Sequence, residues 1–162
     1  MKDVSSVRRG SCEAGMTLLE LIVSCAILVI LASAALPLAR ATIVRERERE
    51  LRRDLQEMRD AIDRYKDLAD RNLIHKEIGS EGYPPDLETL MKGVALGGAG
   101  TAGKTIRFLR SIPVDPMTGH TDWGLRAVQD DPDSTSWGGN NVYDVYSKSF
   151  GTAMDGTKYS DW

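Results

Sequence analysis

A single carboxylate, Glu20, stands near the start of a long apolar run in the sequence GMTLLELIVSCAILVILASAALPLAR, residues 15–40. Glu20 is the only charged residue between Met16 and Ala39. A carboxylate in hydrocarbon costs about 2.5 kcal/mol or more, so a residue of this kind needs a partner. The chemistry that Glu20 predicts is an ion pair with a cation, formed where the segment is packed away from water.

Few other residues have types and spacings that suit catalysis. The sequence contains no HExxH, CxxC or Gly-x-Ser-x-Gly motif. His120 follows a glycine and lies near Asp115 and Asp122, which could orient a base, but loops rich in aspartate often produce such neighbours. We therefore predict that the chain is not an enzyme.

Residues 16–39 are long and apolar enough to predict a membrane-spanning helix. These twenty-four residues would extend about 36 Å as a helix, more than the roughly 30 Å hydrocarbon core of a bilayer. Lys2, Arg8 and Arg9 precede the run, which predicts a cytoplasmic N-terminus, although Arg40 on the other side makes the bias modest.

Two simpler interpretations of this segment stay open at this point. It could be a secretory signal peptide cut near Ala35, or a plain signal anchor. Neither interpretation explains why Glu20 is present, or why the Gly15-Met16 junction stands before the apolar run and not after it.

The stretch Gly15-Met16-Thr17-Leu18-Leu19-Glu20 resembles the prepilin peptidase motif of type IV pilins and type II secretion pseudopilins. The resemblance implies cleavage after Gly15 and methylation of the new amine on Met16, where the family usually has phenylalanine. It also implies that Glu20 meets the N-terminal amine of a neighbouring subunit. Pro37 falls where the family often carries a proline, and it predicts either a kink at the membrane exit or a point where the helix loosens during assembly.

Residues 40–78 predict an amphipathic, charged helix, because apolar residues recur at alternating steps of four and three. This stripe consists of Leu51, Leu55, Met58, Ile62, Tyr65 and Ala69. The stripe could form a coiled coil with another helix, or it could pack on the chain's own C-terminal half, which we favour. Three acid–base pairs at a spacing of four residues should support the helix: Glu48–Arg52, Asp60–Arg64 and Asp67–Arg71.

Residues 79–162 predict a small α/β domain with a short helix over 86–91, a flexible loop over 93–103, and strands over 125–128 and 142–147. The predicted fold class is α+β, in which a long N-terminal helix carries a small antiparallel sheet of two to four strands packed on its second half. The two cysteines, Cys12 and Cys25, lie in the N-terminal part, so no disulfide is available to this domain.

The C-terminal half also resembles the major pseudopilin of type II secretion, through YPPDLETL, FLRSIPVDPMTG, Trp123-Gly124, VYDVYS and a terminal Asp-Gly loop. The family's C-terminal loop binds calcium, which takes oxygen ligands. The resemblance implies that Asp155 matches the aspartate of that loop and that Asp161 lies near a later acidic ligand. The family's Gly-Gly segment is absent and Lys158 adds a positive charge, so an ordinary Asp-Gly turn is the alternative.

The implied function is that of a structural subunit of a type II secretion pseudopilus. Residues 1–15 would be a leader peptide, 16–39 the transmembrane and filament-core helix, 40–78 the charged helix and 79–162 the periplasmic domain. The partners would be other pseudopilins in a homopolymer, prepilin peptidase and the inner-membrane assembly platform. The chain would cross the bacterial inner membrane once, with its N-terminus in the cytoplasm.

Two alternative functions stay open beside this one. A type IV pilin or minor pilin would serve adhesion, motility or DNA uptake, but many pilins carry a C-terminal disulfide loop, which this chain cannot form. A membrane-anchored periplasmic binding module would have no use for Glu20 or for the Gly15 junction. The net charge of −3 disfavours a nucleic-acid partner.

Overall fold

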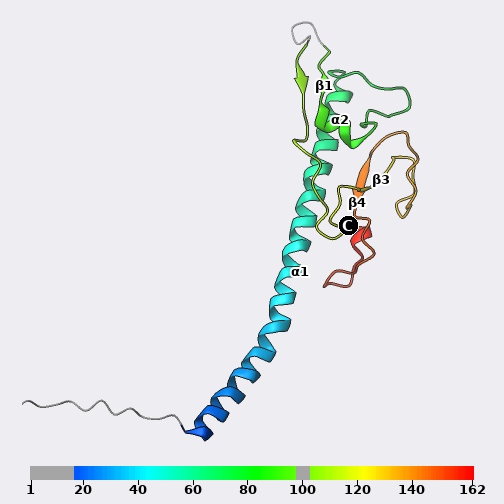
Figure 1. Cartoon of the computed structure of the whole chain (residues 1–162). Helices are drawn as coiled ribbons and strands as arrows, with labels where there is room; N and C mark the ends of the chain where they lie inside the picture. Colours follow the sequence, from blue (N-terminus) through cyan, green and yellow to red (C-terminus); the bar gives the residue numbers. More distant parts are fainter. Residues whose placement is uncertain (1–16, 98–102) are drawn as a thin grey trace, which may run out of the picture. The chain divides into compact units, whose positions relative to one another are not determined.

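Helix α1, Leu18–Asp70, is the longest element of the computed structural model (Figure 1). The structure describes residues 17–97 and 103–162, and for residues 34–39 it describes the backbone alone. The chain divides into two units, Met1–Ala41 and Thr42–Trp162. The elements confirm the predicted α+β class, with a long N-terminal helix and small antiparallel sheets.

In the first unit, the described part of α1 exposes large apolar side chains at consecutive positions, and therefore on every side of the helix. The exposed residues are Leu18, Leu19, Leu21, Ile22, Val23, Ile27, Leu28, Val29, Ile30 and Leu31. Among the side chains that the structure describes, no helix offers a stretch long and apolar enough to cross a membrane. The membrane span expected over 16–39 stays a prediction.

In the second unit, every residue of the predicted apolar stripe of α1 is buried. Leu51, Met58 and Ile62 are completely covered from solvent. They belong to one core cluster with residues that lie far along the chain. Its other members include Leu87, Leu90, Phe108, Leu109, Trp123, Val142, Val145, Ala153 and Tyr159. The period of the stripe therefore identified the side of the helix that is covered.

The C-terminal end of α1 corrects the predicted helix over 40–78, because α1 ends at Asp70. Asn72 has a φ of 54°, in the left-handed region. The Leu73 amide donates to the Leu68 carbonyl at 2.9 Å, and the Asn72 amide donates to the Ala69 carbonyl at 3.0 Å. These two bonds are the Schellman motif, in which asparagine replaces the commoner glycine. The glycines and prolines after residue 78 therefore lie beyond the true end of the helix.

The predicted short helix is α2, Leu87–Lys92, and it begins where the sequence indicated. The Asp86 side chain accepts a hydrogen bond from the Thr89 amide at 2.6 Å, which caps the first turn. Leu87 and Leu90 are the residues of α2 that face the core. A six-residue helix is too short to be stable by itself, so this burial and the cap hold it in place.

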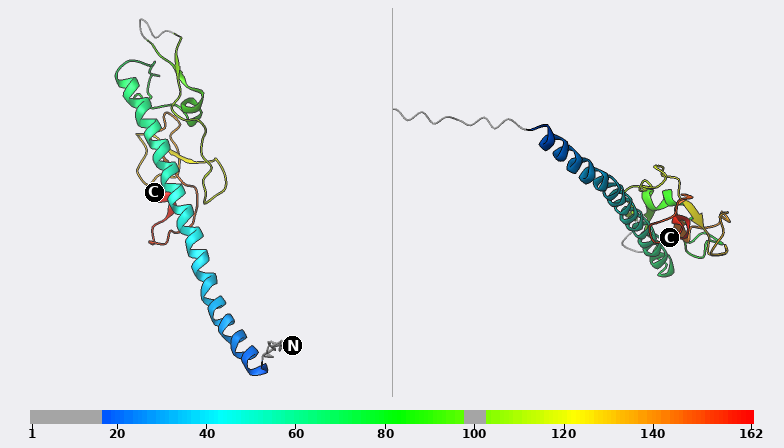
Figure 2. Two further views of the ribbon diagram at one scale, coloured as in Figure 1. Left: turned by 90° about the vertical axis from the view of Figure 1, so that its left-hand side faces the viewer. Right: turned by 90° about the horizontal axis from the view of Figure 1, so that it is seen from below.

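The strands form two sheets of two strands each, where one sheet was expected (Figures 1 and 2). Strands β3, Gly124–Arg126, and β4, Asp144–Tyr146, pair antiparallel with Leu125 opposite Val145. Strands β1, Val94–Ala95, and β2, Thr105–Ile106, also pair antiparallel, although 93–103 was predicted to be a loop throughout. A short 3-10 helix, η1, covers Tyr159–Asp161.

Asp54, on the covered side of α1, has no close ion-pair partner among the described residues. Asp54 is 8% exposed, and its nearest cation is Arg53 Nε at 4.0 Å. Burial raises the pKa of Asp54 above its ordinary value of 3.8; Arg53 opposes this, while Glu50, Glu57 and Asp115 add to it. The ionised form of Asp54 therefore reduces the stability of the folded chain at neutral pH.

We expect Asp54→Asn to raise the melting temperature at pH 7 by about 2 °C. A carboxyl group whose folded-state pKa is raised costs stability above that pKa, and the cost disappears below the ordinary value of 3.8. The gain should therefore shrink as the pH falls toward 4. Melting curves across this range check the prediction, and Asp63→Asn, at an exposed position of α1, is the matched control. A gain that is independent of pH would contradict it.

Candidate functional site

Thr17 caps the start of α1. Its Oγ1 accepts a hydrogen bond from the Glu20 amide at 3.2 Å, and its carbonyl accepts one from the Leu21 amide at 3.1 Å. Thr17 and Glu20 have the spacing of a capping box, in which the glutamate side chain can return to the cap residue. Here only the threonine half is formed among the described residues, so the Glu20 carboxylate is not used by the cap.

The Glu20 carboxylate is exposed, and it has no hydrogen-bond or ion-pair partner among the described residues. Leu18, Leu19 and Leu21 beside it are 77%, 71% and 53% exposed. A helix that is apolar on all sides is stable only when another apolar body covers it. An unpaired carboxylate inside such a contact must find a cation from outside the segment. The N-terminal part of α1 therefore presents an apolar surface and a carboxylate that no described residue covers or pairs.

The structure describes only part of the other residues of the predicted processing and assembly site. Gly15 and Met16 lie outside the described residues. Pro37 lies within the span of α1, and its side chain is among those that the structure leaves undescribed. The assignments of Gly15 and Met16 to processing, and of Glu20 and Pro37 to assembly, stay predictions.

The two predicted calcium ligands lie in the C-terminal segment, residues 152–162. Both of their carboxylates accept hydrogen bonds from other groups of the protein. Asp155 Oδ1 accepts hydrogen bonds from the Thr157 amide at 2.9 Å and from Thr157 Oγ1 at 2.6 Å. Asp161 Oδ1 accepts one from Ser160 Oγ at 3.0 Å. Across the described side chains, no group of three or more His, Cys, Asp or Glu residues is placed to hold a metal ion. Calcium takes six to eight oxygen ligands, and the described side chains offer Asp155 and Asp161 no cluster of further acidic ligands.

Hydrogen bonds hold the pKa of Asp155 below its ordinary value of 3.8. The Thr157 hydroxyl and amide are the main causes, and the charge of Arg52 adds to them. Asp155 is therefore ionised at neutral pH, in a turn that continues through Gly156 at a φ of 89°.

Three polar residues of α1 hold the C-terminal segment. Glu48 Oε1 accepts hydrogen bonds from the Met154 amide at 2.9 Å and from the Tyr159 hydroxyl at 3.1 Å. Arg52 forms an ion pair with Asp155 at 3.2 Å. Arg59 donates to the Trp162 carbonyl at 2.9 Å and to Asp144 at 2.6 Å. Figures 1 and 2 show the C-terminal segment along this part of α1.

Two of these three residues have partners other than the predicted ones. Glu48 and Arg52 were predicted to pair with each other, but each reaches the C-terminal segment instead. Of the three predicted pairs, Asp67–Arg71 forms at 2.9 Å, whereas Arg64 donates to the backbone carbonyl of Asp60. One sequence signal was available. Glu48, Arg52 and Arg59 recur at helical spacing on the same side as Leu55, at the edge of the apolar stripe.

Asp115 has a structural partner and not the catalytic one that was considered. It is completely buried, and its carboxylate accepts hydrogen bonds from Ser147 Oγ at 2.6 Å and from the Met117 amide at 2.7 Å. Asp122 pairs with Lys148 at 2.6 Å. Both carboxylates are therefore paired with residues other than His120. That the chain is not an enzyme stays a prediction.

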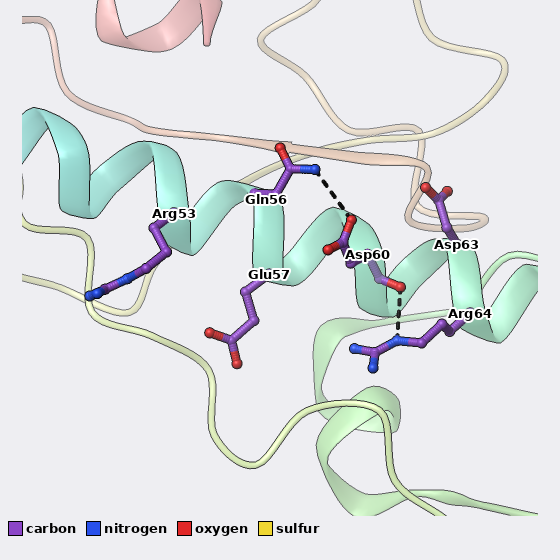
Figure 3. A pocket seen from close by; sticks show the side chains of 6 residues that line it. All are labelled: Arg53, Gln56, Glu57, Asp60, Asp63 and Arg64. Carbon is purple, nitrogen blue, oxygen red and sulfur yellow. Dashed lines mark hydrogen bonds between the residues drawn. The ribbon is translucent and has the colours of Figure 1, made fainter.

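A shallow groove lies along one face of α1 in the second unit (Figure 3). It is lined by Arg53, Gln56, Glu57, Asp60, Asp63 and Arg64. Asp60 Oδ1 accepts a hydrogen bond from Gln56 at 3.3 Å, and Arg64 Nη2 reaches the Phe108 carbonyl at 3.3 Å. Binding sites for small ligands bring a few polar groups to one point, and these side chains do not converge. This groove is therefore not a candidate site.

Comparison with known proteins identifies the N-terminal segment. Residues 10–36 match the family model of the prokaryotic N-terminal methylation motif. The matched segment includes Gly15, Met16 and Glu20, and it indicates a prepilin-type N-terminus that prepilin peptidase processes. It supports the class of type IV pilins and pseudopilins and filament assembly in general. The search of curated proteins and the search of solved structures found no match.

Proposed function

We propose that this chain is a structural subunit of a type II secretion pseudopilus. Prepilin peptidase cleaves it after Gly15, and the new amine of Met16 is methylated. The processed subunit polymerises through its N-terminal helix, and the filament drives folded proteins across the outer membrane. The subunit carries out no catalytic step of its own.

One observation carries this proposal: within the segment that matches the methylation motif, α1 exposes apolar side chains on every side around Glu20, whose carboxylate has no partner among the described residues. Packing such helices together removes their apolar surface from water or lipid, and small residues allow close approach. Cleavage at Gly15 creates an ammonium group on Met16. In an apolar surrounding, the Glu20 carboxylate of one subunit and the Met16 ammonium of its neighbour attract strongly. Assembly thus supplies the partner that the single subunit lacks.

The cysteine positions favour a pseudopilus over a pilus. Both cysteines lie at or before residue 25, so the domain over 79–162 has no disulfide loop of the kind that many pilins carry. A type IV pilin is the second candidate, because the methylation motif is common to both classes. Long surface fibres in immunogold micrographs would indicate the pilin, and short fibres confined to the periplasm would indicate the pseudopilin.

The proposed location follows from the same helix. Residues 16–39 anchor the subunit in the bacterial inner membrane before assembly, with the N-terminus in the cytoplasm and the C-terminal domain in the periplasm. The partners are other copies of the subunit, further pseudopilins, prepilin peptidase and the inner-membrane assembly platform.

Mass spectrometry of the N-terminus from native membranes tests the proposal. We expect a chain that begins at Met16 and carries one methyl group on its amine. Gly15→Leu should leave the full leader attached in nearly all molecules, because the peptidase requires the small residue at the junction. Gly10→Leu, which alters a glycine away from the junction, should be processed normally. A wild-type chain that begins at Met1, or is cut near Ala35, would refute the processing step.

A further inference from the structure

The last eleven residues, 152–162, contact one another as well as α1. Thr152 and Lys158 form an antiparallel bridge, and the Ala153 amide donates to the Thr157 carbonyl at 2.8 Å. The Trp162 indole Nε1 donates to Thr157 Oγ1 at 2.7 Å, and its ring meets Tyr159 edge to face at 5.2 Å. Residues 152–162 therefore form a closed loop, the C-terminal loop, with Asp155 at its turn.

The cation at this loop is an arginine. Arg52 Nη2 lies 3.2 Å from Asp155 Oδ2, the carboxylate oxygen that Thr157 does not occupy. The Arg52 guanidinium carbon also lies 4.1 Å from the centre of the Trp162 ring. One guanidinium thus contacts both the turn and the end of the C-terminal loop. An arginine suits this position because its planar group can stack on an aromatic ring while it donates to a carboxylate.

The neighbouring carboxylates of this loop also accept hydrogen bonds from protein groups. Glu48, one turn before Arg52 on α1, is engaged with the Met154 amide and the Tyr159 hydroxyl. Asp161 accepts a bond from Ser160. A calcium ion at Asp155 would be repelled by the Arg52 guanidinium, which already lies 3.2 Å from Oδ2. It would also need several further oxygen ligands, and the described side chains offer no cluster of acidic residues to supply them.

We infer that Arg52 takes the place of a metal ion in this chain and fastens the C-terminal loop to α1, so that the loop is closed without calcium. This inference does not depend on filament assembly, since every contact lies within the unit Thr42–Trp162. The loop and its arginine thus make the folded subunit independent of the divalent ions around it.

Thermal unfolding of the full processed chain in detergent tests this inference. We expect the same melting temperature in calcium chloride and after treatment with EGTA, and no heat of binding when calcium chloride is titrated into the chelated protein. Arg52→Ala should lower the melting temperature by about 2–5 °C in both conditions, because it removes an exposed ion pair and a ring contact. Arg49→Ala, at an exposed position one turn earlier on α1, should change it by less than about 1 °C.

A second variant distinguishes loss of the Arg52–Asp155 contact from general destabilisation of the fold. Asp155→Asn removes the charge that Arg52 meets, so the double variant Arg52→Ala with Asp155→Asn should lose less than the sum of the single variants. A melting temperature that falls by several degrees in EGTA and recovers with calcium would overturn the inference in favour of a calcium site. An Arg52→Ala chain as stable as the wild type would overturn it as well.

Discussion

Glu20→Ala should be processed like the wild type but reduced about 100-fold in assembled filaments. The proposed ion pair joins Glu20 of one subunit to the Met16 amine of its neighbour. Removing one partner of a pair buried in an apolar contact costs about 3 kcal/mol, because the other charge is left alone. That free energy corresponds to about a 100-fold change in an association constant. The measurement is the fraction of subunits in sheared, sedimented filaments, quantified by immunoblot.

The controls for this prediction separate assembly from processing and folding. Glu46→Ala removes an exposed acid further along α1 and should assemble like the wild type. Mass spectrometry should show that Glu20→Ala still begins at methylated Met16. Melting of the unit Thr42–Trp162 should be unchanged, since Glu20 lies in the other unit. Filaments formed equally well by Glu20→Ala would show that the docking hypothesis is wrong.

Asp115→Ala should destabilise the C-terminal domain by about 3 kcal/mol and lower its melting temperature by about 10 °C. Asp115 and Ser147 are both completely buried, and the carboxylate also accepts the Met117 amide. Removing it leaves the buried Ser147 hydroxyl and the partly buried Met117 amide without an acceptor. Each unsatisfied buried group costs about 1–3 kcal/mol, so the two together produce a large loss.

The matched control for Asp115 is Asp122, which pairs with Lys148 on the surface. Asp122→Ala should cost less than about 1 kcal/mol, because exposed ion pairs contribute little. Ser147→Ala should lose less than Asp115→Ala, and the double variant should lose less than the sum, since the two residues share one hydrogen bond. If Asp115→Ala and Asp122→Ala melt at the same temperature, the buried network does not stabilise the fold.

The fold was predictable where it depends on neighbours in the sequence. The steps of four and three in α1 identified the buried stripe from Leu51 to Ala69, because residues at this spacing share one face of a helix. Asp86 marked the start of α2 through its local cap. The end of α1 is equally local, at the left-handed Asn72, but the more conspicuous glycines and prolines after residue 78 predicted a later end.

The candidate site was also predictable only where its signal lies within one short stretch of sequence. The N-terminal motif, with Gly15, Met16 and Glu20, could be recognised in the sequence, and the family model matches it. A peptidase reads a short linear segment, so the relevant signal is contiguous. The proposed calcium ligands rested on the positions of Asp155 and Asp161, and the sequence alone could not show which cation would face them.

By itself, the sequence determined the methylation motif, the isolated carboxylate of Glu20, the covered face of α1 and the α+β class. Only the tertiary structure decided the partners of the charged groups. Glu48 and Arg52 contact the C-terminal loop and not each other, and Asp115 accepts a hydrogen bond from Ser147. Arg52 and Asp155 are 103 residues apart. A helix period or a cap is set by residues within one or two turns of the helix. An ion pair forms wherever folding brings opposite charges together, so the local sequence does not predict which distant charges will meet.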